Sequence, residues 1–219
     1  MPRFVDLSHT IYDGLVTYPG LPAPKVGEYL DRATSRERYA SGTEFSIGRI
    51  ELVANTGTYL DAPSHRYEDG HDLAELPLET LADLPGVVVR APRGVRAIGE
   101  ELFAGKDLAG RAVLVDTGWA RHFGSPAYGT GHPFLTRAAA ELLVARGAVL
   151  VGIDSLNIDD TATGERPVHS LLLERDVRIV EHLVHLERLP DAGFRFFAVP
   201  VKVRGMGSFP VRAFALLEE

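Results

Sequence analysis

Apolar and β-branched residues are grouped in short runs that are separated by glycine, proline and polar residues. Such runs are typical of buried β-strands, because a helix needs a longer stretch with apolar residues three and four positions apart. The pattern predicts at least seven strands, at Phe4–Leu7, Phe45–Val53, Val87–Val89, Ala112–Val115, Ala148–Ile153, Phe194–Val203 and Val211–Leu217.

Helical patterns are fewer. The segment Pro133–Arg146 opens with proline, carries apolar residues at helical spacing and stops at Gly147, which predicts a helix. Shorter patterns indicate helices from Val168 to about Arg175 and from Pro77 to Leu84. Many strands with few helices, and some strands adjacent in sequence, favour an α/β fold with a mixed sheet over a strictly alternating doubly wound one.

The chain of 219 residues contains no repeat and no Gly/Ser linker, which predicts one domain over residues 1–219. Long polar connections at 18–43, 67–76 and 121–132 are of the kind that often carries function. Because no leader-like start and no apolar run of about 18 residues occurs, we expect no membrane partner and a cytoplasmic location.

Charge, composition and motif content exclude several classes of function. Acidic residues number 30 and basic residues 23, and the net charge of −7 argues against nucleic acid as a partner. The absence of cysteine excludes thiolate nucleophiles and leaves His, Asp, Glu and neutral oxygens as metal ligands. No Walker loop, dinucleotide fingerprint or Gly-x-Ser-x-Gly motif occurs, which argues against nucleotide binding and classical serine-hydrolase chemistry. The expected partner is a small-molecule substrate.

One cluster of chemically active residues follows a predicted strand. The segment from Asn55 to His65, NTGTYLDAPSH, places Asp61 and His65 four residues apart on a turn shaped by Gly57 and Pro63. This spacing is compatible with a catalytic pair, but equally with a turn-capping aspartate and a surface histidine.

A second cluster lies far along the chain. His169 stands at a predicted helix start and Glu181 ends a short apolar run, so both side chains can point into a cleft. A hydrogen-bonded histidine and a solvated glutamate are the simpler interpretation of each residue alone. His182 and His185 are three apart and fit one helix face, yet they form no metalloprotease motif, which favours a structural role.

The order of several segments resembles the cyclase family of metal-dependent hydrolases, which includes bacterial kynurenine formamidase and isatin hydrolase. The family motif His-x-Gly-Thr-His-x-Asp-x-Pro-x-His aligns in register with Asn55–His65. Further similar segments are VDLSHTI near the start, TYPG at 17–20, DTGW at 116–119, VGIDSLNID at 151–159, VHSLLL from Val168, IVEHL from Ile179 and GSFPVRAFAL from Gly207. The resemblance spans nearly the whole chain. It implies a mixed, partly barrel-like β-sheet flanked by helices, of the swivelling β/β/α kind, and a homodimer or homotetramer.

The resemblance also implies two sets of metal ligands, and the first of these sets is incomplete in this sequence. In the family, histidines at the positions of Asn55 and Tyr59 join the aspartate matching Asp61 around one ion. Asn55 offers only a neutral oxygen, and Tyr59 coordinates well only as a phenolate, which its reference pKa of about 10 disfavours. The first metal position is therefore expected to be empty or weak.

The second set is complete, because family residues matching Asp61, His169 and Glu181 hold the other ion. We therefore expect one divalent ion, Zn or Mn, and the last motif histidine, His65, as general acid and base. In the family, an aromatic residue just before a Pro-Gly pair lines the substrate site. Tyr18 occupies this position, so the resemblance implies that it binds the substrate.

The resulting hypothesis is a metal-dependent hydrolase of a small amide, formamide or lactam. Two alternatives remain open at this point. Tyr59 and His65 can instead serve a metal-free cyclase or isomerase, with the phenol donating a hydrogen bond to an enolate or carbonyl oxygen. A catalytically silent binding protein on the same fold is the other alternative.

Overall fold

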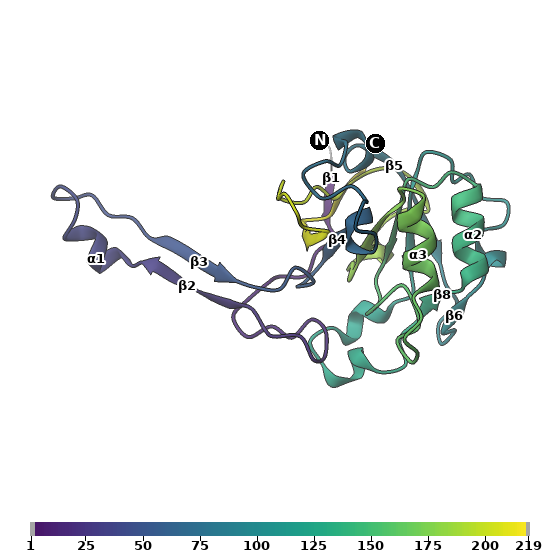
Figure 1. Ribbon diagram of the computed structural model, residues 1–219, viewed down its shortest axis with the longest axis horizontal. Coiled ribbons are helices and arrows are strands. Elements are labelled where there is room, and N and C mark those ends of the chain that lie inside the picture. Colours follow the sequence, from purple (N-terminus) through teal and green to yellow (C-terminus); the bar gives the residue numbers. More distant parts are fainter. Residues whose placement is uncertain (1–2, 218–219) are drawn as a thin grey trace.

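The computed structural model describes residues 3–217, and its centre is a nine-stranded mixed sheet (Figure 1). Four neighbouring strands run parallel, namely β5 (Leu84–Arg90), β7 (Ala112–Asp116), β9 (Leu150–Ile153) and β10 (Arg178–Glu181). Parallel strands are covered on both faces and therefore read as continuous apolar runs, which is why the sequence pattern detects most of them.

Antiparallel strands extend this parallel core on both sides. Beyond β5 lie β11 (Ala192–Phe197), β13 (Phe214–Leu217) and β1 (Arg3–Asp6), and beyond β10 lie β4 (Tyr59–Asp61) and β12 (Ser208–Pro210). The order across the sheet is β1-β13-β11-β5-β7-β9-β10-β4-β12. The expected mixed, partly barrel-like α/β architecture is confirmed, since the sheet curls into a half-barrel with few helices.

The two faces of the sheet bury separate cores. Helices α2 (Arg137–Ala145) and α3 (Pro167–Glu174) lie side by side against one face (Figure 1). Because side chains alternate along a strand, Val113 and Val115 of β7 join the core under these helices. Leu114 points to the other core, on the opposite face of the sheet.

A long arm projects from this body (Figure 1). It consists of β2 (Lys25–Leu30) and β3 (Ile47–Glu51), with the short helix α1 (Arg32–Arg36) near its tip. The antiparallel register pairs Val26 with Ile50, and these two side chains are 45% and 53% exposed. The arm therefore presents apolar side chains on one face of a two-stranded ribbon.

Shorter elements complete the described chain. Two-residue strands β6 (Ala97–Ile98) and β8 (Phe134–Leu135) pair in parallel. Single 3₁₀ turns are η1 (Pro63–His65), η2 (Leu78–Thr80), η3 (Glu100–Phe103), η4 (Trp119–His122), η5 (Pro126–Gly129) and η6 (Leu186–Arg188). Within residues 3–217, no helix is long and apolar enough to cross a membrane.

Several predicted boundaries were wrong. The helix predicted from Pro133 begins only at Arg137, because the Thr136 hydroxyl caps the helix by accepting from the backbone N–H of Ala139. The helix predicted at 77–84 is a single 3₁₀ turn, after which the chain enters β5. The strand predicted at 194–203 ends at Phe197. The connection at 18–43 contains β2 and α1, which the pattern missed.

Candidate functional site

The candidate site is built on one face of the sheet where β10, β4 and β12 meet. Tyr59 and Asp61 are two residues apart on β4, so their side chains share a face. The antiparallel register sets Tyr59 opposite Glu181 of β10 and Asp61 opposite Ser208 of β12. Strand pairing thus brings together three segments that are far apart in the sequence.

His169 reaches this group from the first turn of α3. The carboxylate of Asp159 accepts hydrogen bonds from the backbone N–H of Val168 and of His169, at 2.7 and 3.0 Å. The same carboxylate lies 2.6 Å from Nδ1 of His169 and so fixes the ring. Nε2 of His169 then stands 3.7 Å from Oδ2 of Asp61 and 3.7 Å from Oε1 of Glu181.

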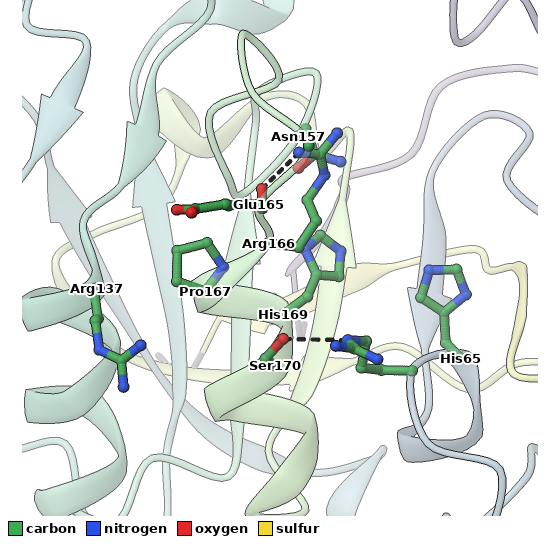
Figure 2. Close-up of a pocket in the computed structure, with 10 residues that line it drawn as sticks. His65, Arg137, Asn157, Glu165, Arg166, Pro167, His169 and Ser170 are labelled. Carbon is green, nitrogen blue, oxygen red and sulfur yellow. Dashed lines mark hydrogen bonds between the residues drawn. The ribbon is translucent and has the colours of Figure 1, made fainter.

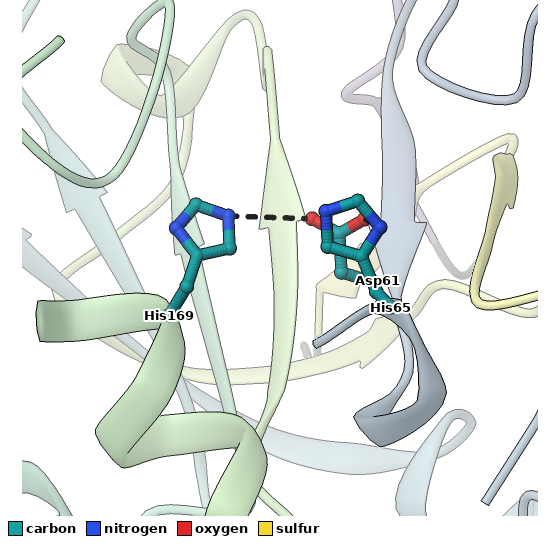
Figure 3. A group of neighbouring side chains, drawn as sticks. All are labelled: Asp61, His65 and His169. Atoms are coloured by element: carbon teal, nitrogen blue, oxygen red, sulfur yellow. Dashed lines mark ion pairs between the residues drawn. The ribbon is translucent and has the colours of Figure 1, made fainter. Parts of the chain in front are cut away.

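Asp61 is completely buried, and its two oxygens have different surroundings. Oδ1 accepts a hydrogen bond from the Ser208 hydroxyl, whereas Oδ2 has no hydrogen-bond partner among residues 3–217. Burial raises the pKa of Asp61, but the interaction with His169 and the nearby His65 imidazole outweigh burial and lower it. Asp61 therefore presents one unsatisfied anionic oxygen toward His169 (Figure 3).

His65 closes the other side of Asp61, from the turn η1. Its Nδ1 lies 2.8 Å from the Ser208 hydroxyl and 3.7 Å from Oδ1 of Asp61. Because Ser208 donates its proton to Asp61, its oxygen can accept from Nδ1–H of His65, which leaves Nε2 with a lone pair. The turn packs directly on Gly207, where a Cβ atom would lie 2.3 Å from the backbone nitrogen of His65.

Glu181 is held by two donors. Oε1 accepts from the backbone N–H of Ile158 at 2.6 Å, and Oε2 accepts from the phenol of Tyr59. Burial raises the pKa of Glu181 to about 7; His169 opposes this rise and the charge of Asp61 adds to it.

Tyr59 and Asn55 occupy the positions of the two motif histidines. Burial is the largest cause that raises the pKa of Tyr59 well above its usual value, followed by the charges of Glu181 and Asp61. Tyr59 is therefore a neutral phenol. The Asn55 side chain has the opposite effect and lowers the pKa of Tyr59, which places the two replaced positions near each other and near Glu181.

The remaining donors fit a divalent cation. Asp61, His65 and His169 each offer a ligand atom, and these atoms lie within 4.8 Å of one another. Two donors at about 2.1 Å from a tetrahedral ion are about 3.4 Å apart, close to the spacing between His169 and its two carboxylates. The Asp159–His169 pair is the carboxylate–histidine arrangement that orients a metal ligand.

Without an ion, the same carboxylates hold a proton on His169. Burial is the largest single cause and lowers the pKa of His169. The hydrogen bond with Asp159 and the nearby carboxylates of Asp61 and Glu181 together raise that pKa to about 10. The site therefore has a strong preference for positive charge at Nε2.

An open pocket of about 560 Å³ lies next to His65 and His169 (Figure 2). Tyr18, the predicted substrate-binding residue, lies near the site, because the charges of Arg166 and Glu181 both act on its hydroxyl. Burial raises the pKa of Tyr18, and the charge of Glu181 raises it further, against the opposing effect of Arg166.

His182 and His185 do not share a helix face as predicted. Both have left-handed backbone conformations, with φ of 57° and 61°, which no helix accommodates. His182 is fully buried, and its Nδ1 lies 2.8 Å from the hydroxyl of Tyr128.

Sequence reasoning did not single out Asp159 or Ser208. Asp159 lies eight positions before Pro167, outside the usual N-cap position, and Ser208 reaches Asp61 only through strand pairing. No local spacing marks either residue.

The fold and the site together define a mixed α/β domain with a buried carboxylate–imidazole centre beside an open pocket. A protein family described as "Putative cyclase" matches residues 5–160. The chain belongs to this family.

Known relatives extend over the whole chain. The kynurenine formamidase of Maricaulis maris is 29% identical over 216 residues, covering 97% of each chain, and that of Bacillus cytotoxicus is 26% identical over 212 residues, covering 96% of each. Among solved structures, a potential metal-dependent hydrolase with cyclase activity superposes with a TM-score of 0.81 at 26% identity, over the full length of both chains. Isatin hydrolase A from Labrenzia aggregata superposes with a TM-score of 0.85 at 23% identity, covering 100% of this chain and 94% of its own, and supports the fold.

Proposed function

We propose that the protein is a hydrolase that uses one divalent metal ion to cleave the C–N bond of a small amide, formamide or lactam. The observation that carries the proposal is the buried, unpartnered Oδ2 of Asp61, which faces Nε2 of a histidine held from behind by Asp159. The kynurenine formamidase and isatin hydrolase relatives support the reaction class.

Asp61, His169 and Glu181 are the proposed ligands. Two carboxylates neutralise a dication, and one imidazole adds a donor suited to Zn²⁺ or Mn²⁺. His65 also lies close enough to Asp61 and His169 to act as a ligand in place of Glu181. We assign the metal role to Glu181 because its carboxylate is fully buried, whereas the side chain of His65 is 35% exposed and borders the pocket.

Amide hydrolysis requires a proton to leave the attacking water and another to reach the departing nitrogen. When bound, the ion would polarise the carbonyl and make water more acidic. His65 is placed to move the proton, because Nδ1 is oriented by Ser208 and Nε2 stays available. Ser208 in turn ties this imidazole to Asp61.

The position of Tyr59 favours the hydrolase over a metal-free isomerase. A phenol has one proton to donate, and Tyr59 donates it to Glu181. In this proposal Tyr59 positions Glu181 and does not stabilise an oxyanion of the substrate.

The test is turnover of formanilide, the formamide of kynurenine and isatin by protein loaded with Zn²⁺ or Mn²⁺. We expect hydrolysis that a chelator abolishes and added metal restores. His65→Ala should keep its metal and lose about 10²-fold or more in kcat. The matched control is His71→Ala, which removes an exposed histidine outside the site.

Turnover that survives complete removal of metal, or full activity in His65→Ala, would overturn the proposal. Loss of metal in His65→Ala would instead make His65 the third ligand.

A further inference from the structure

The walls of the pocket beside His65 and His169 are polar and carry positive charge. Besides His65 and His169, its lining includes the arginines Arg66, Arg137 and Arg166 and the carboxylate of Glu165. Three arginines thus stand against one carboxylate, in a chain whose net charge is −7. Most small-molecule pockets are lined mainly by apolar side chains, so this lining indicates a charged ligand.

Arg66 follows His65 directly and extends along the pocket. Its Nε donates to the hydroxyl of Ser170 on α3 at 3.2 Å, and its guanidinium lies 5.3 Å from the centre of the Tyr67 ring. Both contacts orient the side chain without neutralising it. Within residues 3–217, Arg66 forms no ion pair with a carboxylate.

Arg166 borders the pocket at the start of α3, next to His169 (Figure 2). Its Nη1 donates to the backbone carbonyls of Thr163 and Glu165, at 2.8 and 2.6 Å. These neutral acceptors fix the guanidinium and leave its charge uncompensated. In the described part of the chain, Arg166 also has no carboxylate partner.

Arg137 differs from these two. It lies on the far side of Pro167 from His65 (Figure 2), and its Nε is 2.9 Å from the carboxylate of Glu141. Its charge is already paired, so Arg137 serves as an internal comparison.

The backbone at the N-terminus of α3 is not available to bind an anion. The N–H groups of Val168 and His169 both donate to Asp159. An anion in this pocket must therefore be bound by side chains, and a guanidinium matches the geometry of a carboxylate with two parallel hydrogen bonds.

We infer that the substrate carries a carboxylate, separate from the amide that is cleaved, and that Arg66 and Arg166 bind this carboxylate. The inference rests on the proposed function for the reaction, and on the two fixed, unpaired arginines for the specificity. The substrate class is accordingly an amide or lactam of a carboxylic acid.

The experiment compares matched substrates with and without a carboxylate: 2-formamidobenzoate against formanilide, and 5-oxoproline against 2-pyrrolidinone. For the metal-loaded protein we expect kcat/KM to favour the carboxylate member of a pair by tenfold or more, mainly through KM. Arg66→Gln and Arg166→Gln should bring this ratio toward one, whereas Arg137→Gln should keep it. Arg66→Lys and Arg166→Lys, which retain the charge, should recover part of it.

Binding is measured separately, by calorimetric titration of benzoate into the same proteins. We expect binding that weakens as salt rises and is lost in Arg66→Gln and Arg166→Gln, with Arg137→Gln as the control. If the protein binds benzoate but hydrolyses none of the four amide and lactam substrates, the proposed function is contradicted and the carboxylate site is supported. No benzoate binding, or equal binding by all variants, would overturn the carboxylate site itself, as would an equal preference for neutral substrates.

Discussion

The phenol of Tyr59 donates a hydrogen bond to Oε2 of Glu181, from a position that is a histidine in the family motif. Both side chains are buried, so this bond satisfies a carboxylate oxygen that water cannot reach. Tyr59→Phe would leave that oxygen without its donor. We expect the free energy of unfolding to fall by about 1–3 kcal/mol in chemical denaturation. Tyr12→Phe, at an exposed tyrosine, is the control, and equal stability of the two variants would contradict this role.

The same relationship predicts how the first metal position can be restored. Asn55→His combined with Tyr59→His removes the hydrogen bond from the Tyr59 phenol to Glu181 and supplies the two imidazoles of the family motif. We expect the double variant to bind close to two ions per chain, measured by elemental analysis after exposure to Zn²⁺. A stoichiometry equal to that of the unsubstituted protein would argue that the position is no longer shaped for an ion.

His9 makes the stability of the folded protein depend on pH. Burial, with a smaller effect of His185, lowers the pKa of His9 to about 4, and its ring stacks on Phe123 at 3.6 Å between centroids. The unfolded chain binds a proton below pH 6.5, whereas the folded chain does so only near pH 4. Stability is therefore lost as the pH falls from 6.5 toward 4, by up to about 3 kcal/mol from this group.

His9→Phe keeps a ring against Phe123 and removes the titrating group. We expect a smaller loss of unfolding free energy between pH 6.5 and 4 in this variant, measured by denaturant melts across that range. The buried His182, whose pKa is lowered to about 3, contributes in the same direction and remains. A pH dependence identical to that of His71→Phe, the exposed control, would count against His9.

The expectation of a homodimer or homotetramer, which the family resemblance implies, stays a prediction. Two-stranded ribbons are marginally stable in water, and the Val26–Ile50 pair on the arm is exposed in the single chain. Contact with a second copy would cover it. We expect light scattering to give the mass of two or four chains, and Val26→Ser with Ile50→Ser to shift the mass toward one chain. A single-chain mass for the unsubstituted protein would contradict the expectation.

Local sequence patterns predicted much of the sheet because its central strands are buried on both faces and therefore apolar throughout. They missed β10, in which Arg178 and Glu181 leave an apolar run of only two residues, and β4, which has only three residues, Tyr59–Asp61. Asp61, His169 and Glu181 were predicted through the family resemblance, since each alone has a simpler interpretation.

The partners of these residues could not be predicted from the sequence. Ser208 reaches Asp61 only because β12 pairs with β4, and the pairing of distant strands is not encoded in local spacing. The charges of Arg66 and Arg166 were likewise uninformative until the fold placed both on one pocket, where neither has a carboxylate partner among residues 3–217.

The proposed activity depends on a divalent ion held by Asp61 and His169, and the metal content of the purified protein shows whether that ion is bound. The measurement is made before and after exposure to Zn²⁺ and Mn²⁺, on the unsubstituted chain, Asp61→Ala and His169→Gln. Asp69→Ala, at an exposed carboxylate, is the control, and thermal melts verify that each variant is folded. We predict about one ion per chain in the unsubstituted protein and the control, and none in folded Asp61→Ala or His169→Gln. An unsubstituted protein that takes up no ion under any of these conditions, or an Asp61→Ala variant that keeps its ion, would contradict the account.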